Sequence, residues 1–179
     1  MLAQLLIVGY FLTYLFESDN GWGILAVLSI MVFSASWIAL RTTKASRSSF
    51  YEKALCAIAL GGGINLLIVT QGVLYITPWY SPRFLIPLAG MIFAGAMNSI
   101  SIAAERIQTE MNRDVPYTKA RGIALKASLI PIVNSLFAVG LVSLPGMMTG
   151  QVLSGVSPLI AARYQIMVMC MLFASAGIS

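Results

Sequence analysis

The sequence predicts an all-α, polytopic membrane protein with about six transmembrane helices, organised as a single domain over residues 1–179. Hydrophobic residues make up 59% of the chain and charged residues only 9%, and the mean hydropathy is +0.87. A soluble domain carries about 25% charged residues, so this composition is typical of an integral membrane protein. The apolar stretches are continuous and do not alternate at every second residue, which favours helices as the spanning elements.

The first two apolar stretches cover residues 2–16 and 22–40. The first is somewhat short for a span. The second carries Trp22 and Trp37 near its two ends, where aromatic side chains anchor helices at the membrane–water boundaries. A basic loop, residues 41–53, follows the second stretch. This region therefore predicts two spans and a loop that stays on one side of the membrane.

The third and fourth stretches cover residues 54–76 and 85–104. The third contains a glycine triplet at 61–63, which predicts a close contact with another helix or a kink. A long polar segment, residues 105–126, comes after the fourth stretch. We expect the fourth helix to continue into this segment, and a new helix to begin after Pro116.

The fifth and sixth stretches cover residues 127–144 and 158–179, and the pair Pro145–Gly146 breaks the chain before the last span. Proline cannot donate the backbone hydrogen bond that a continuing helix needs. In lipid such a break is tolerated only where the freed groups face protein, water or a cavity. Two interpretations stay open: a turn outside the membrane between two spans, or part of a path for a solute.

The basic residues predict the orientation of the chain. The net charge of +5 comes from lysines and arginines that cluster in the segments 41–53 and 105–126. The positive-inside rule places both segments in the cytoplasm, and the clustering favours contact with the bilayer over binding to nucleic acid. No charge occurs between Lys126 and Arg163, so a tight membrane hairpin that returns Arg163 to the cytoplasm is the alternative topology.

The apolar stretches lack the groups that catalysis requires. None of them contains Asp, Glu, His or Lys, and Arg163 is their only charged residue. Cys56 and Cys170 lie inside apolar runs, where cysteine serves as a small packing residue. The sequence predicts neither an enzyme, a metal site nor a bound cofactor. It also contains no nucleotide-binding motif, so active transport would draw its energy from another chain.

Uncharged polar and thioether side chains are the candidates for a substrate pathway. Such residues more often hydrogen-bond between helices or fill gaps in helix packing than bind a solute. The candidate pathway residues are Met91, Asn98, Asn134, Pro145, Gly146, Met147, Met148 and Gln151.

Four segments resemble the FetB family of ABC-transporter permeases, which includes bacterial iron-export subunits and plant relatives linked to aluminium tolerance. These are residues 86–98, 127–135, 139–151 and 162–169, of which the run Leu144-Pro-Gly-Met-Met-Thr-Gly150 is the most specific. The resemblance implies a permease of the bacterial inner membrane that exports iron, another metal-related solute or a small polar solute. Its implied partners are a separate ABC ATPase, a second copy of the permease and the lipid bilayer.

The resemblance also places the coupling to the ATPase in the segment 105–126, for which the candidate residues are Glu110, Arg113, Lys119 and Arg121. This segment departs from the family because it is shorter and lacks the Leu-Gly-Ala-Thr element found there. Family members also extend beyond both ends of this chain, so we expect a longer natural protein. The rival hypotheses are a passive pore or carrier that needs no ATPase, and a fragment that does not transport.

Overall fold

A computed structural model describes residues 2–17, 21–41 and 47–179, and every regular element in these residues is helical. Residues 42–46 of the expected basic loop therefore lie outside the described residues. The α-helices are α1 (Leu2–Glu17), α2 (Gly21–Ala39), α3 (Arg47–Ala57), α4 (Gly63–Leu67), α5 (Pro82–Met111), α6 (Tyr117–Ala138), α7 (Gly146–Leu153) and α8 (Pro158–Ile178). Two π-helical segments, η1 (Ile58–Gly62) and η2 (Ile68–Val73), flank α4. The all-α prediction is confirmed.

Five helical segments of the described chain are long and apolar enough to cross a membrane. They are α2, the continuous run Phe50–Val73, α5, α6 and α8. The first expected stretch forms α1, whose 16 residues reach about 24 Å at 1.5 Å per residue, less than the roughly 30 Å of a hydrocarbon core. The chain is thus a polytopic helical membrane protein, and its described residues include five helical segments long enough to span a membrane and the shorter α1.

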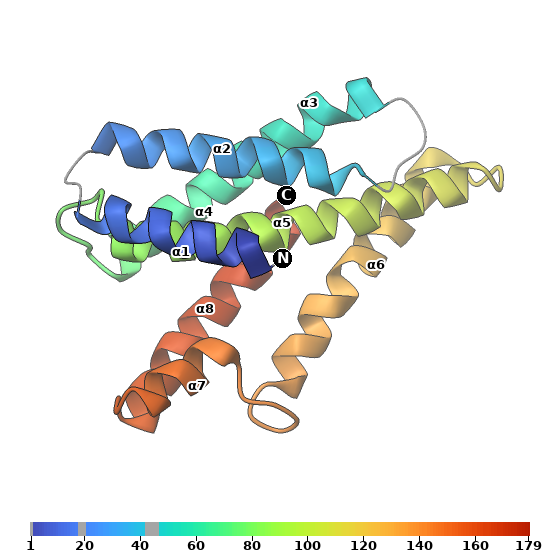
Figure 1. Ribbon diagram of the computed structural model, residues 1–179. Coiled ribbons are helices and arrows are strands. Elements are labelled where there is room, and N and C mark those ends of the chain that lie inside the picture. Colours follow the sequence, from blue (N-terminus) through green and yellow to red (C-terminus); the bar gives the residue numbers. More distant parts are fainter. Residues whose placement is uncertain (1, 18–20, 42–46) are drawn as a thin grey trace.

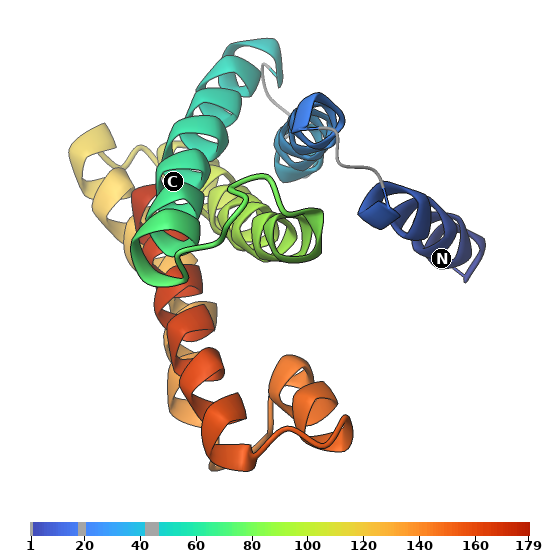
Figure 2. The same cartoon turned by 90° about the vertical axis from the view of Figure 1, so that its left-hand side faces the viewer.

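Helix α5 is the centre of the structure. It packs against α2, the third span, α6 and α8, and Figures 1 and 2 show α2 and α3 on one side of it while α6 and α8 lead away on another. The side chains of Ala89, Ile92 and Ala96 on α5 have no exposed surface. Their spacing of three and four residues places them on one face, which forms the middle of the hydrophobic core.

Helix α6 approaches α5 closely through small side chains. Its buried residues are Ala120, Ala124 and Ser128, each four positions after the last. This spacing puts them on one stripe of the helix. Small residues on a stripe let two backbones come together, which in a membrane is a main source of helix association.

A tight turn joins α5 to α6, so the expected polar segment 105–126 is largely helical. Helix α5 continues to Met111 and not to residue 104, and α6 begins at Tyr117, directly after Pro116 as expected. Between them Asp114 has a φ of +59°. The backbone amides of Asp114 and Val115 donate to the carbonyl oxygens of Met111 and Glu110 at 3.1 and 3.2 Å. This is the Schellman pattern, which satisfies the last carbonyls of a helix and fixes the exit of the chain.

The break before the last span begins earlier than the sequence suggests. Helix α6 ends at Ala138 and not at residue 144, and Gly140 takes a φ of +82° in the turn that follows. Pro145 is the residue before α7, and Gly146 is the first residue of that short helix. The Pro145–Gly146 pair thus starts a helix, and the preceding helix has already ended at Ala138.

The third span makes its closest helix contact at the glycine triplet. A Cβ atom placed on Gly62 would lie 2.9 Å from two ring carbons of Phe93 on α5, whereas one placed on Gly63 would meet nothing within 4 Å. The triplet also spans the boundary between η1 and α4. The expected close contact is therefore present, and two of the three glycines make it, because a Cβ atom placed on Gly61 would also lie 3.2 Å from Cγ2 of Ile178 on α8.

Candidate functional site

A cleft of about 360 Å³ lies between α5, α6 and α8. Its walls come from three helices that meet around the middle of α5. The lining residues are Met91, Ala94, Gly95, Asn98, Ser99 and Ile102 of α5, Ser128, Pro131, Ile132 and Ser135 of α6, and Leu172 and Ala176 of α8. The cleft is therefore the place in the described structure where polar side chains of several spans gather.

The serine hydroxyls of α6 present acceptor oxygens to this cleft. Ser128 Oγ donates to the backbone carbonyl oxygen of Leu125, and Ser135 Oγ donates to that of Pro131, each at 2.9 Å. A hydroxyl has one hydrogen and two lone pairs, so a hydrogen used in this way leaves only acceptor capacity. Pro131 adds to this effect because it has no N–H for the carbonyl four residues before it. Uncharged oxygens of this kind suit a cation or a solute rich in donors.

The cleft brings together two of the eight candidate pathway residues. Met91 and Asn98 line it, and Asn98 is exposed. Asn134 is also exposed but does not line the cleft, although the next residue does. The remaining five candidates surround the start and middle of α7, which packs on α8 away from this lining: Pro145, Gly146, Met147, Met148 and Gln151.

Residues near α7 have their own polar feature. The side-chain oxygen Oε1 of Gln151 on α7 is buried without a hydrogen-bond donor, and so is Oε1 of Gln165 on α8. Met147, at the start of α7, packs against the hydrophobic core. The structure therefore divides seven of the eight candidate pathway residues between the cleft and the α7–α8 pair and leaves Asn134 in neither group.

Three serines that line the cleft, Ser99, Ser128 and Ser135, were not among the pathway candidates from the sequence. Ser128 and Ser135 flank Pro131 at distances of three and four residues, a pattern that places both on the same side of α6. The sequence shows this spacing, but it does not show that the two serines line the same cleft as Asn98, because Asn98 belongs to another helix. Among the described residues, no three His, Cys, Asp or Glu side chains group so that they could hold a metal ion.

The candidate coupling residues lie around the turn between α5 and α6. Glu110 is buried, and its Oε1 lies 2.8 Å from Arg106 Nη2 and 4.0 Å from Arg113 Nη1. Arg113, Lys119 and Arg121 are exposed. The buried Glu110 carboxylate thus forms an ion pair with Arg106 of its own helix. The other three candidate residues present their charges to the surroundings of the tip.

Comparison with known proteins gives consistent relatives over most of the chain. A UPF0014 membrane protein of Synechocystis is 38% identical over 183 residues, covering 94% of this chain and 71% of the relative. The Escherichia coli protein named "Probable iron export permease protein FetB" is 35% identical over 195 residues, covering 99% of this chain and 73% of the relative. Protein ALUMINUM SENSITIVE 3 of Arabidopsis thaliana is 32% identical over 192 residues, covering 98% of this chain and 68% of the relative. No solved structure matches the chain significantly.

The family profile matches in two pieces that meet in the tip between α5 and α6. The profile described as "Uncharacterised protein family (UPF0014)" matches residues 1–121 and 115–179. The alignment to the Escherichia coli relative has more positions, 195, than this chain has residues, 179, so some positions of that alignment have no counterpart here. Matches that cover the chain from end to end, and relatives at 32–38% identity, show that the chain belongs to the UPF0014 family of membrane proteins.

Proposed function

We propose that this chain is the membrane-spanning permease subunit of an ABC exporter and that it moves iron, another metal-related solute or a small polar solute out of the cytoplasm. The observation that carries the proposal is the cleft between α5, α6 and α8, which offers uncharged acceptor oxygens next to the thioether of Met91. A relative named as a probable iron export permease supports the same function. Oxygen and thioether ligands without charge bind a cation weakly, as a path with release at its end requires.

The proposed energy source is ATP hydrolysis in a separate ABC ATPase, so the chain itself is not an enzyme. The tip between α5 and α6 is the proposed docking element, because it is rigidly formed and presents Arg113, Lys119 and Arg121 outward. The positive-inside rule favours a cytoplasmic location for this tip in the bacterial inner membrane. Two copies of the chain, each contributing one cleft, would form the path.

Transport in inside-out membrane vesicles tests this proposal. Vesicles that contain the chain and an ABC ATPase that co-purifies with it should accumulate radioactive iron when ATP is added. A catalytically inactive ATPase should abolish this uptake. Uptake that continues with the inactive ATPase would instead establish the passive pore or carrier. A chain that binds no ATPase and transports none of the metal ions or small polar solutes offered would be the non-transporting fragment.

A further inference from the structure

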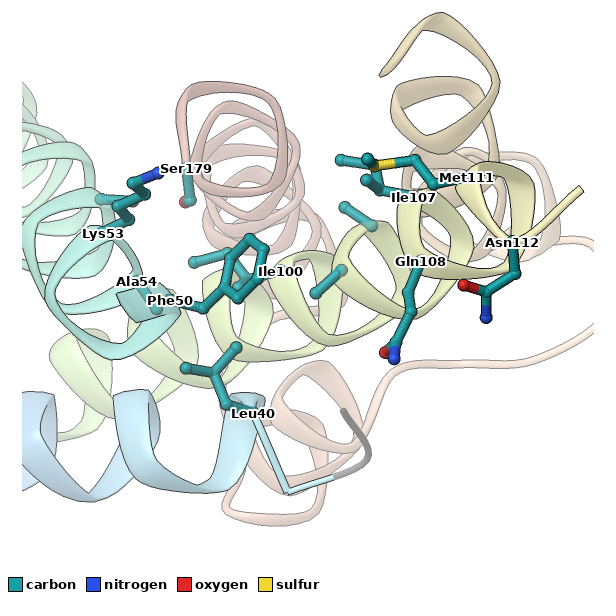
Figure 3. A pocket seen from close by; sticks show the side chains of 13 residues that line it. Leu40, Phe50, Lys53, Ala54, Ile100, Ile107, Gln108, Met111, Asn112 and Ser179 are labelled. Carbon is teal, nitrogen blue, oxygen red and sulfur yellow. The ribbon is translucent and has the colours of Figure 1, made fainter. Parts of the chain in front are cut away.

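A second cavity, of about 410 Å³, lies away from the cleft, between the residue after α2, the Phe50–Ala57 part of α3, the last part of α5 and Ser179 after α8. Figure 3 shows Lys53 at one end of it and Asn112 at the other, with the Phe50 ring between them. Its lining residues are Leu40, Phe50, Lys53, Ala54, Ala57, Ile100, Ala103, Ala104, Ile107, Gln108, Met111, Asn112 and Ser179. The proposed transport function uses none of these residues.

The cavity exists because small side chains face each other where the helices diverge. Ala54 and Ala57 of α3 stand opposite Ala103 and Ala104 of α5, and none of them is large enough to fill the space. Further along the third span, Gly62 lies directly against Phe93 of α5, and no cavity remains between the two spans there. The walls are almost entirely apolar, and a dry apolar cavity favours hydrocarbon over water. Its volume falls within the range of pockets that bind small ligands.

The cavity lies where two candidate spans have their ends, which is the level expected for the boundary between hydrocarbon and headgroups. Helix α2 ends at Ala39, next to the lining residue Leu40, and Phe50 begins the third span. Helix α5 has 30 residues, about 45 Å at 1.5 Å per residue, so it continues beyond a hydrocarbon core of roughly 30 Å. An occupant at this level would have an apolar part among the alanines and a polar part at the membrane surface.

The charges around the cavity indicate the polar part. Lys53 is the only charged side chain among the described lining residues, and its Nζ lies 5.7 Å from the centre of the Phe50 ring. Two exposed arginines directly follow lining residues, Arg41 after Leu40 and Arg113 after Asn112. Basic pockets between membrane helices suit the phosphate of an anionic lipid. We propose that an anionic phospholipid occupies this cavity, with one acyl chain between α3 and α5 and its phosphate beside Lys53, the cation that lines it.

Lipid that stays bound through purification provides the first test. Native mass spectrometry of the purified chain should show one phospholipid per copy of the cavity, and phosphatidylglycerol should displace phosphatidylcholine of the same acyl chains. Replacing both cations, Arg41→Gln with Lys53→Gln, should lower the apparent affinity for phosphatidylglycerol roughly tenfold. The matched control, Arg83→Gln with Arg163→Gln, removes two exposed cations elsewhere and should change nothing. Equal affinity in the two double variants would overturn the assignment of the headgroup.

A photoreactive lipid provides the second test and does not depend on a variant that folds poorly. Phosphatidylglycerol with a diazirine in its acyl chain should label peptides that contain residues 50–57 and 100–112. Ala104→Phe, which fills the cavity, should abolish this labelling, whereas Ala26→Phe on the exposed side of α2 should not. Labelling spread evenly over all apolar helices would refute a specific site. Cross-links from these residues to a second copy or to the ATPase, in place of lipid, would assign the cavity to that partner and refute the proposal.

Discussion

The side-chain amide of Asn65 donates a hydrogen bond to the backbone carbonyl oxygen of Met171, with 2.8 Å between Nδ2 and O, although the two residues stand 106 positions apart. Both residues are buried. A second bond of the same kind joins Ser175 Oγ to the carbonyl oxygen of Ile92 at 2.7 Å. Helix α8, which forms one wall of the cleft, is thus tied to the third span and to α5 by buried hydrogen bonds in which the side chain is the donor.

Replacing Asn65 with Leu should destabilise the fold by a modest amount. Interhelical hydrogen bonds in membranes contribute about 0.6 kcal/mol on average and at most about 1.7 kcal/mol, so we expect a loss of the free energy of unfolding within that range. Unfolding in mixed micelles with increasing denaturing detergent measures it. Gln71→Leu, at an exposed position of the same span, is the control and should leave the stability unchanged. An equal loss in both variants would show that the bond to Met171 carries no stability of its own.

Gly62→Ala should be far more damaging than Gly63→Ala. The new Cβ atom at Gly62 would lie 2.9 Å from the Phe93 ring, so that the ring or the backbone must move. Overpacking of this kind costs about 1–3 kcal/mol. Gly63→Ala meets nothing within 4 Å and should be neutral or slightly stabilising in the same unfolding measurement. Restoration of stability by the double variant Gly62→Ala with Phe93→Leu would establish the steric cause, and its failure would point to the π-helical backbone instead.

Charge reversal at the tip between α5 and α6 should separate docking from folding. Lys119→Glu with Arg121→Glu changes two exposed side chains, so we expect normal insertion and folding but loss of the co-purified ATPase. Arg113 is less suitable because it lies 4.0 Å from Glu110. Glu110→Ala removes the partner of Arg106 and should cost about 2 kcal/mol of stability, between the values for exposed and buried ion pairs. Full ATPase recovery with the double reversal would leave these cations as contacts for lipid phosphates.

Labelling of single cysteines should establish the orientation. In a background that lacks Cys56 and Cys170, Thr118→Cys at the tip should resist an impermeant thiol reagent in intact cells, and Ser157→Cys between α7 and α8 should react. Both positions are exposed, so a difference between them reports the side of the membrane and not burial. Reaction of Thr118→Cys from outside would reverse the topology. Protection of both positions would favour the alternative membrane hairpin.

Hydropathy and punctuation predicted the helical class, most spans and the start of α6 after Pro116. The end of one helix was not predictable in this way. Glu105 marked the expected exit of the fourth span from the membrane, and the helix continues beyond it to Met111 as expected, because charged residues can leave the membrane without leaving the helix. Pro145 marked the expected end of the fifth span, but the positive φ of Gly140 shows that the chain turns earlier. Hydropathy reports whether a residue prefers lipid or water, whereas the end of a helix depends on local backbone hydrogen bonds.

The cleft itself was only partly predictable. Sequence reasoning could name Asn98 as a polar residue at membrane depth, because its stretch is otherwise apolar. It could not show that Ser128 and Ala176 lie beside it, since α5, α6 and α8 meet only through tertiary packing. The π-helical backbone of η1 and η2 also leaves no mark in the hydropathy, because it changes hydrogen-bond partners and not composition.

The two asparagines of the candidate pathway now allow a sharp test of the cleft. Asn98 and Asn134 are both exposed, both lie in spans and both were equally good candidates by sequence, yet only Asn98 lines the cleft. Asn98→Leu replaces a hydrogen-bonding wall with an apolar one and should reduce ATP-dependent iron uptake at least tenfold, because a solute that sheds water there loses a partner worth about 1.5 kcal/mol. Asn134→Leu should keep nearly normal uptake. Equal expression and equal unfolding free energies are the controls for folding.

If both variants transport normally, the cleft is not the path, and the buried amide oxygens near α7 become the better candidates. If Asn134→Leu alone fails, the path runs along the other side of α6, and the proposed cleft is a packing defect between three helices.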